Sequence, residues 1–242
     1  MTGDWNLGND VVDLCHHGAS RRSQDLRFLT RVFTEEERSD ILSTPDPDRS
    51  VWIHWAGKEA IYKSVSKALG SPPVFVHSRF TVRFPPADLE RFTAADLRAQ
   101  EDLLCGTGQY EDLRFQIRVE GSASFLQAVS WSRRPDGMTP GFQWDCHLAQ
   151  EETRGVPTEL RGVFSAEEWA CITHRASALT RIRAREALAV SLSVEVTDLQ
   201  IRCREGLPGR RIPTVWLRNR EIPVDLTLSH HGAFLAWAFL SP

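Results

Sequence analysis

The residues best suited to chemistry lie in one segment of helical pattern, residues 55–63, which reads WAGKEAIYK. Glu59 and Lys63 are four residues apart and therefore share a helix face, whereas Lys58 lies about 100° away from Glu59 around the helix. The chain contains three lysines, all in this region, at positions 58, 63 and 67. Two interpretations of the Glu59–Lys63 pair remain: an ordinary solvated ion pair or a functional site. Its apolar neighbours and the clustering of the lysines favour the functional site.

A second candidate is Asp10, an acid within an otherwise apolar run. Gly8 and Asn9 precede it, and Val11 and Val12 follow it. A buried carboxylate without a partner is costly, so Asp10 needs a compensating group. A divalent metal ion shared with the glutamate of the WAGKEAIYK segment would supply one.

The elements that must position these acids and lysines can be inferred from hydrophobic patterning. The apolar run 7–14 predicts a buried strand. Thr34 followed by three glutamates predicts a helix that starts with a capping box. Residues 50–69 have apolar positions at helical spacing and predict a long helix, which Gly70-Ser71-Pro72-Pro73 ends.

The remainder of the first half predicts antiparallel strands. Alternating apolar residues predict a strand over 74–84, and residues 113–119 with 122–132 predict a hairpin. Residues 85–108 are polar and support no assignment. The stretch 132–141, which contains Pro and Gly, is the predicted linker.

A second unit begins near Phe142. Ser165 is a predicted N-cap, and it opens a helical region over 169–194. Gly206-Leu207-Pro208-Gly209 predicts a turn. Strands are predicted at 199–203, 214–217, 224–228 and 234–240. We therefore expect an α+β fold built as a pseudo-dimer of two similar halves, 1–140 and 141–242, each a long helix packed on a small antiparallel sheet.

Composition excludes several classes of function. The 242 residues are 41% hydrophobic, which predicts a folded chain with a sizeable core. A net charge of -3 gives no global attraction for nucleic acid or for an anionic membrane. No apolar run reaches the length of a membrane span, and the N-terminus does not resemble a signal peptide. Five scattered cysteines without zinc-site spacing indicate reduced thiols. We therefore expect a cytoplasmic protein without nucleic-acid or membrane partners.

Phosphate-binding loops of the common nucleotide-binding proteins are also missing from the sequence. Neither G-x-x-x-x-G-K nor G-x-G-x-x-G occurs. This argues against an ordinary nucleotide kinase and against a dinucleotide-dependent enzyme.

Three segments together resemble the 4'-phosphopantetheinyl transferase superfamily. They are GNDVVD at 8–13, RFLTRVFTEEE at 27–37 and WAGKEAIYK at 55–63. In that superfamily a G-x-D strand and a W-x-x-K-E-A-x-x-K helix hold magnesium and coenzyme A. The opening strand is similar to that of holo-acyl-carrier-protein synthases, whereas the length and doubled plan are similar to the surfactin-type transferases, which are single-chain pseudo-dimers.

The second half also resembles the surfactin-type enzymes, but a different part of them. The segments RIRAREAL at 181–188, EGLP at 205–208 and LTLSHHG at 226–232 resemble the N-terminal half of those enzymes. Here they follow the metal-binding half, so we infer that the two halves occur in swapped order. The resemblance covers 7–84 and 160–240; residues 85–155 match nothing that we recognise.

The resemblance implies a Mg²⁺-dependent enzyme. It would transfer 4'-phosphopantetheine from coenzyme A to a serine of an acyl or peptidyl carrier protein, and would release adenosine 3',5'-bisphosphate. It would serve fatty acid, polyketide or nonribosomal peptide biosynthesis as a monomer that docks an acidic, helical carrier protein. The alternative is an inactive paralogue that binds coenzyme A or a carrier protein without turnover.

The resemblance also implies roles for particular residues. Asp10 and Glu59 would be the metal ligands, and Asp10, Glu59 and Lys63 the catalytic residues. The implied coenzyme A contacts are Lys58, Lys63, Ser229, His230, Arg181 and Arg175. Glu59, Lys63 or a water near Asp10 could take the serine proton, and the sequence leaves these alternatives open. His230 could equally have a structural role.

The sequence departs from the surfactin-type pattern near the metal site. Val12 stands where those enzymes carry a second acid, so a water would complete the coordination. Asp13 is displaced by one residue, which in a strand directs it to the opposite face. Gly57 interrupts the motif helix and suggests close approach of backbone or ligand.

Overall fold

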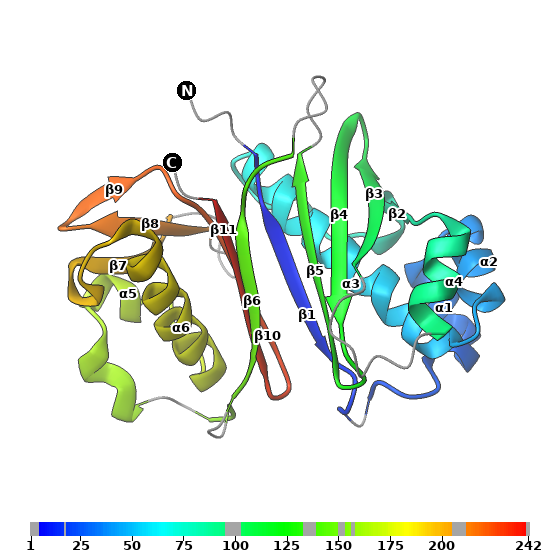
Figure 1. The fold of residues 1–242 in the computed structure, drawn as a ribbon, viewed down its shortest axis with the longest axis horizontal. Helices are drawn as coiled ribbons and strands as arrows, with labels where there is room; N and C mark the ends of the chain where they lie inside the picture. The colour runs from blue at the N-terminus through cyan, green and yellow to red at the C-terminus, as the bar shows by residue number, and fades with distance from the viewer. Residues whose placement is uncertain are drawn as a thin grey trace.

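The computed structural model describes residues 5–16, 18–94, 103–132, 139–149, 153–155, 158–204 and 212–240. Two antiparallel sheet systems lie side by side, each with its long helix, and strand β1 runs along the centre of the molecule (Figure 1). Most of the predicted linker (133–138) and the predicted turn 206–209 lie outside the described residues.

The first sheet has five antiparallel strands in the order β1-β5-β4-β3-β2. Their bounds are β1 (Gly8–Asp13), β2 (Phe80–Arg83), β3 (Leu104–Tyr110), β4 (Leu113–Gly121) and β5 (Phe125–Ser132). The predicted long helix is present as α3 (Pro47–Ala68) and packs on this sheet. It begins three residues earlier than expected because Asp46 accepts a hydrogen bond from Arg49 N at 3.0 Å and Pro47 occupies the first turn.

Short helices surround α3 at the outer end of the first sheet (Figure 1). They are η1 (Arg22–Gln24), α1 (Leu26–Val32), α2 (Glu35–Ser43), η2 (His77–Arg79) and α4 (Pro86–Ala94). The predicted capping box at Thr34 is confirmed, since Thr34 and Glu37 exchange hydrogen bonds. The prediction of a strand over 74–84 was too long, because only Phe80–Arg83 pairs with β3.

The second unit carries two three-stranded sheets, β10-β11-β6 and β7-β8-β9. The strands are β6 (Gln143–Leu148), β7 (Leu199–Cys203), β8 (Pro213–Leu217), β9 (Arg220–Ile222), β10 (Asp225–His231) and β11 (Phe234–Leu240). The helices are η3 (Thr158–Val163), α5 (Ala166–Trp169), α6 (Arg175–Leu192) and η4 (Val196–Asp198). Helix α6 packs against these strands through an apolar cluster that includes Leu188, Ile201 and Phe239.

Two expectations for the second unit were wrong. The predicted continuous helix over 169–194 is split: α5 ends at Trp169, and α6 begins at Arg175. A strand, β6, precedes the helix, whereas the sequence led us to expect the helix first. The predicted N-cap at Ser165 is confirmed, with a capping box to Glu168.

Strand β1 is joined to β10 by side chains. Leu7 N donates to Asp225 Oδ2 at 2.7 Å, Val11 N donates to Ser229 Oγ at 3.2 Å, and Asp13 N donates to His231 Nδ1 at 2.9 Å. Backbone N–H groups at the β1 edge of the first sheet therefore find their hydrogen-bond acceptors in the second unit. The two strands run in the same direction along this seam.

Glu37 joins three elements of the first unit through one buried carboxylate, an arrangement that we call the Glu37 bridge. Its Oε2 accepts from Thr34 N at 2.8 Å and pairs with Lys58 Nζ at 2.7 Å. Its Oε1 accepts from Val82 N at 2.8 Å. The side chains of Lys58 and Glu37 are 0% and 3% exposed. The start of α2, the middle of α3 and strand β2 are thereby fixed together.

The second unit contains the same arrangement, which we call the Glu168 bridge. Glu168 Oε2 accepts from Ser165 N at 3.0 Å, and Oε1 accepts from Ile201 N at 2.8 Å. Arg185 on α6 pairs with Glu168 Oε1 at 3.4 Å. In both units a capping-box glutamate thus connects a short helix, the long helix and the strand that follows the long helix.

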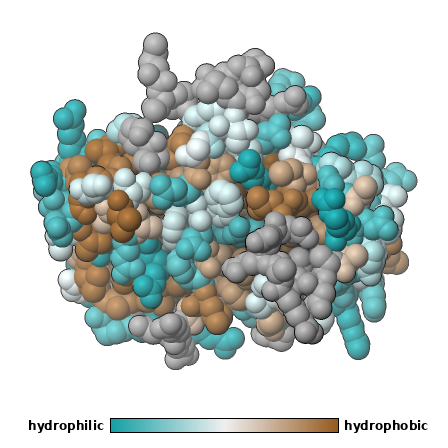
Figure 2. All heavy atoms as spheres, in the orientation of Figure 1, coloured by the Kyte–Doolittle hydropathy of each residue, from teal (hydrophilic) through white to brown (hydrophobic). Residues whose placement is uncertain are grey.

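Among the described residues, no helix is long and apolar enough to cross a membrane. Polar and apolar residues are interspersed on the face seen in Figure 2. Single exposed apolar side chains such as Val190 and Leu26 need no special explanation.

We expect Gly8→Ala to destabilise the protein by about 1 to 3 kcal/mol or more, because α3 packs against β1 without room for a side chain. A Cβ at Gly8 would lie 1.9 Å from Ala60 O and 2.7 Å from Ser64 Oγ. The measurement is the free energy of unfolding in urea. Gly141→Ala is the matched control, since a Cβ there meets nothing within 4 Å; equal unfolding free energies for the two variants would contradict the close packing.

We expect Lys58→Met to cost about 3 to 5 kcal/mol of unfolding free energy, because it leaves the Glu37 carboxylate buried without its cation. Arg183→Met is the control: Arg183 pairs with Glu186, both side chains are 50% exposed, and its loss should cost at most about 0.5 kcal/mol. Chemical denaturation of both variants measures the difference. A small effect at Lys58 would contradict the role of the Glu37 bridge.

Candidate active site

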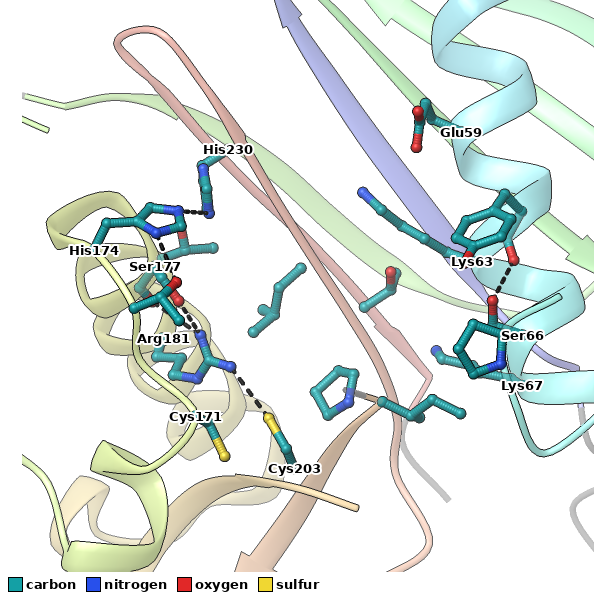
Figure 3. Close-up of a pocket in the computed structure, with 18 residues that line it drawn as sticks. Glu59, Lys63, Ser66, Lys67, Cys171, His174, Ser177, Arg181, Cys203 and His230 are labelled. Atoms are coloured by element: carbon teal, nitrogen blue, oxygen red, sulfur yellow. Dashed lines mark hydrogen bonds between the residues drawn. The ribbon is translucent and has the colours of Figure 1, made fainter. Parts of the chain in front are cut away.

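A cavity of about 450 Å³ lies between α3 and α6 and is crossed by β10 (Figure 3). Glu59, Lys63 and Lys67 of α3 line one side. Arg181 of α6 lines the other, and His230 of β10 lies between them. The wall therefore carries three basic side chains, Lys63, Lys67 and Arg181, which suits an anionic ligand.

Asp10 lies directly beside this cavity, on β1. It is 9% exposed, and its Oδ1 accepts hydrogen bonds from Lys63 Nζ at 3.0 Å and from Ser229 Oγ at 2.9 Å. These two donors compensate the buried charge, so the partner that the sequence required for Asp10 is provided in part by protein groups.

Lys63 connects the motif helix to β1. Its ammonium group donates to the Asn9 carbonyl at 2.5 Å and to Asp10. Glu59 lies one helical turn before Lys63, and in Figure 3 its carboxylate is on the same side of α3 as the Lys63 ammonium. The structure therefore pairs Asp10 with Lys63 and places Glu59 on the same cavity wall as Lys63.

His230 and His174 face each other across the cavity wall. Their Nε2 atoms are 3.2 Å apart, so one ring donates to the other (Figure 3). Burial, then the nearby charges of His174, Lys63 and Arg181, lower the pKa of His230 to about 4. His230 is therefore neutral near pH 7 when no anion is bound. His174 was not among the predicted site residues, and its place directly before the arginine helix is the signal in the sequence that could have found it.

Arg181 enters the cavity from α6. Its Nη1 donates to Ser177 Oγ at 2.6 Å and to Ser177 O at 3.2 Å, and its Nη2 lies 3.5 Å from Cys203 Sγ. Its Nε is buried and has no hydrogen-bond partner among the described residues. Because a buried guanidinium donor needs an acceptor, an oxygen-rich anion would complete this environment.

Lys58 is not brought into the cavity. Besides its pair with Glu37, its Nζ donates to His77 O at 3.2 Å and to Phe80 O at 2.5 Å. It lies on the face of α3 that packs in the core, about 100° from Glu59. The expected role of Lys58 as a coenzyme A contact is therefore corrected to a structural one.

Three other predicted residues are also placed differently from expectation. Ser229 alternates with His230 along β10 and faces Asp10 and β1 rather than the cavity. Arg175 begins α6, forms an ion pair with Glu159 and is not among the residues that line the cavity. Gly57 faces the Val82 side chain, which a Cβ would approach to 3.1 Å, so core packing rather than a ligand explains this glycine.

Asp13 and Lys67 have structural partners. Asp13 accepts from Cys15 N at 2.9 Å and from Ala233 N at 3.0 Å, so it holds the turn between β10 and β11. Lys67 forms an ion pair with Asp225 and donates to Leu226 O at 2.8 Å. Burial lowers the pKa of Lys67.

The carboxylates beside the cavity could hold a hard cation such as Mg²⁺ only together with oxygen atoms of a bound ligand or of water. Asp10 and Glu59 are oxygen donors of the type that Mg²⁺ prefers. The described residues contain no group of three or more His, Cys, Asp or Glu side chains that could hold a metal ion alone. Mg²⁺ keeps several waters and shares substrate phosphates in such sites, so two carboxylates beside a cationic cavity fit a metal that arrives with a phosphate ligand.

Comparisons with known proteins agree with this geometry. Residues 6–117 match the family model of the 4'-phosphopantetheinyl transferase superfamily. A holo-[acyl-carrier-protein] synthase of Chlamydia pneumoniae is 32% identical over 66 residues, which are 27% of this chain and 54% of that protein. The chain thus spans about half the length of this relative and of its Chlamydia muridarum counterpart.

Two further relatives are covered more fully. The mitochondrial holo-[acyl-carrier-protein] synthase of Eremothecium gossypii is 26% identical over 161 residues, which are 62% of this chain and 79% of that protein. The holo-[acyl-carrier-protein] synthase of Shewanella frigidimarina is 28% identical over 97 residues, which are 40% of this chain and 77% of that protein.

The family match corrects one boundary from the sequence analysis. Residues 85–155 were thought to match nothing, but the family model continues to residue 117 and so includes β3 and part of β4. Strand β1, the motif helix α3 and the carboxylates of Asp10 and Glu59 all lie within the matched region. Over residues 6–117, slightly less than half of its length, this chain is therefore similar to the 4'-phosphopantetheinyl transferase superfamily.

Proposed function

We propose that this protein transfers 4'-phosphopantetheine from coenzyme A to a serine of an acyl or peptidyl carrier protein, with release of adenosine 3',5'-bisphosphate. The observation that carries the proposal is the shared cavity: Lys63, which binds Asp10, lines it together with Glu59, His230 and Arg181. The relatives named as holo-[acyl-carrier-protein] synthases support a carrier protein as the acceptor.

Asp10 and Glu59 would hold Mg²⁺. A bound Mg²⁺ would neutralise charge on the pyrophosphate of coenzyme A and favour attack on the β-phosphate. Ser229 would hold Asp10 in place for this role, since its hydroxyl donates to Asp10 Oδ1 while accepting from Val11 N. We therefore assign Ser229 to positioning rather than to a phosphate contact.

The phosphates of coenzyme A would be bound by residues from both units. Lys63 can turn from Asp10 towards a phosphate oxygen once a metal shares that carboxylate. His230 and His174 offer ring nitrogens at the centre of the cavity, and Arg181 offers its buried Nε. Arg181 suits the doubly charged 3'-phosphate because guanidinium groups bind phosphate in a bidentate manner.

Glu59 is our choice for the group that receives the serine proton. Lys63 already pairs with Asp10 and donates a hydrogen bond to Asn9 O, so its nitrogen is engaged as a donor. A carboxylate can accept the proton directly or through a water, and Glu59 lines the cavity from the side of α3. The serine hydroxyl would then attack the β-phosphate as its proton leaves.

We also propose that the chain is a pseudo-dimer whose halves are in swapped order. The element order β6-α6-β7-β8-β10-β11 follows that of β1-α3-β2-β3-β4-β5. The Glu37 and Glu168 bridges join corresponding elements. One chain would then supply both walls of the cavity, which supports a monomeric enzyme.

We expect Glu59→Gln to lower the rate of transfer at least about a hundredfold, through loss of a metal ligand and of the proton acceptor. The measurement is intact mass spectrometry of apo acyl and peptidyl carrier proteins incubated with the enzyme, coenzyme A and Mg²⁺. Glu186→Gln on α6 is the control, because Glu186 pairs with Arg183 on an exposed surface.

A mass gain of one phosphopantetheine group, lost in Glu59→Gln or with a chelator, is the expected result. Coenzyme A binding by the wild type without mass gain on any carrier would contradict the transferase and support a binding protein.

We expect coenzyme A binding to be accompanied by proton uptake at His230. A bound phosphate favours the imidazolium ion and raises the pKa of His230 from about 4. Affinity should therefore increase as the pH falls from about 7 towards the pKa of the complex. Calorimetry in buffers of different ionisation enthalpy measures the uptake in the wild type and in His230→Gln.

The difference in proton uptake between the wild type and His230→Gln reports on His230 alone, because the titration of coenzyme A itself contributes equally to both. His147→Gln is the control, since His147 on β6 pairs with Asp145 and does not line the cavity. Equal proton uptake by wild type and His230→Gln would contradict the contact between His230 and a phosphate.

A further inference from the structure

Two cysteines from different elements meet in the wall of the cavity. We propose that Cys171 and Cys203 form a thiol–disulfide exchange site, at which a small-molecule disulfide oxidises the pair and weakens ligand binding to the cavity. The part of this inference that concerns the ligand rests on coenzyme A being the occupant, as proposed above.

The pair is already assembled in the structure. Cys171 follows α5 in the segment that leads to α6, and Cys203 is the last residue of β7. Both line the cavity, their thiols are hydrogen-bonded to each other, and Figure 3 shows both sulfur atoms beside Arg181. The two thiols are therefore neighbours, as formation of a disulfide requires.

The remaining cysteines offer no such pair. Cys15 and Cys105 are exposed on separate elements, and Cys146 lies on β6. Burial raises the pKa of the Cys146 thiol, which keeps it protonated and unreactive. A mild disulfide reagent should therefore form an intramolecular cross-link between Cys171 and Cys203, whereas the exposed thiols of Cys15 and Cys105 can react singly.

The two thiols differ in reactivity. The hydrogen bond with Cys171, followed by burial, raises the pKa of the Cys203 thiol far above its usual range, so Cys203 is a poor first nucleophile. Cys171, in the segment between helices, attacks one sulfur of the reagent R–S–S–R, and R–S⁻ leaves and takes up a proton. Cys203 then attacks the Cys171 sulfur of the mixed disulfide, and a second R–SH leaves. Two protein thiols become one disulfide, and the reagent is reduced to two thiols.

Oxidation acts on the cavity through Arg181. Arg181 Nη2 lies 3.5 Å from Cys203 Sγ, so a new bond to that sulfur removes or displaces a partner of the guanidinium group. The disulfide would also restrict the position of Cys171, which lies three residues before His174. His174 in turn contacts His230. Both changes alter the arrangement that would receive the phosphates of coenzyme A.

The test uses the full chain, fully reduced and then titrated with glutathione disulfide. Peptide mapping should find a Cys171–Cys203 cross-link with the loss of two hydrogens. Calorimetry should find coenzyme A bound about tenfold more weakly after oxidation, the equivalent of one hydrogen bond to a charged group, and dithiothreitol should restore the affinity.

Variants make the assignment specific. In Cys171→Ser and Cys203→Ser, the affinity for coenzyme A should be the same before and after treatment with glutathione disulfide. The untreated sample of each variant is the reference for its treated sample. Cys105→Ser, at an exposed position of β3, should respond as the wild type does. A cross-link elsewhere, or no cross-link while the thiols react singly, would overturn the exchange site.

The two levels of the inference can fail separately. A cross-link between Cys171 and Cys203 without any coenzyme A binding by the reduced protein would confirm the exchange site and overturn the proposed occupant. Coenzyme A binding that is unchanged by a complete cross-link would overturn the effect on the cavity.

Discussion

The buried carboxylate of Glu37 fixes the helix that carries the candidate catalytic residues. A charge in the core is tolerated only when every polar partner is supplied, and here the partners come from α2, α3 and β2. This requirement sets the rotation of α3. With Lys58 directed into the core, Glu59 and Lys63 necessarily face β1 and the cavity. The chemistry of one helix face therefore depends on an ion pair on another.

The cavity itself depends on the seam between β1 and β10. Asp10 is positioned by Lys63 from its own unit and by Ser229 from the other. Arg181 and His174 belong to α6 and its N-terminus, and Glu59 belongs to α3. Basic side chains of one unit thus face the carboxylates of the other, an arrangement that supports the proposed binding of a phosphate ligand together with a metal ion.

Much of this could be predicted from local sequence. Capping boxes at Thr34 and Ser165, the long helix and most strands depend on neighbouring residues. The helical spacing of Glu59 and Lys63 places both on the cavity side of α3, and Lys63 pairs with Asp10. Strand β3 was missed because its glycines read as loop; a Cβ at Gly108 would lie 2.1 Å from Ile61 Cδ1, a constraint that exists only once α3 packs on the sheet. The role of Lys58 was predicted wrongly because a core-facing and a cavity-facing lysine look the same in sequence. The role of Ser229 was predicted wrongly because its partner, Asp10, lies on a strand more than two hundred residues away.

The contacts along the seam do not depend on the order in which the two units are joined. Three side chains of β10 accept the backbone N–H groups of β1, and none of these contacts involves the connection between β5 and β6. The register between the units is encoded in side chains that each unit carries with it. These three contacts therefore require no particular order of the two units along the chain.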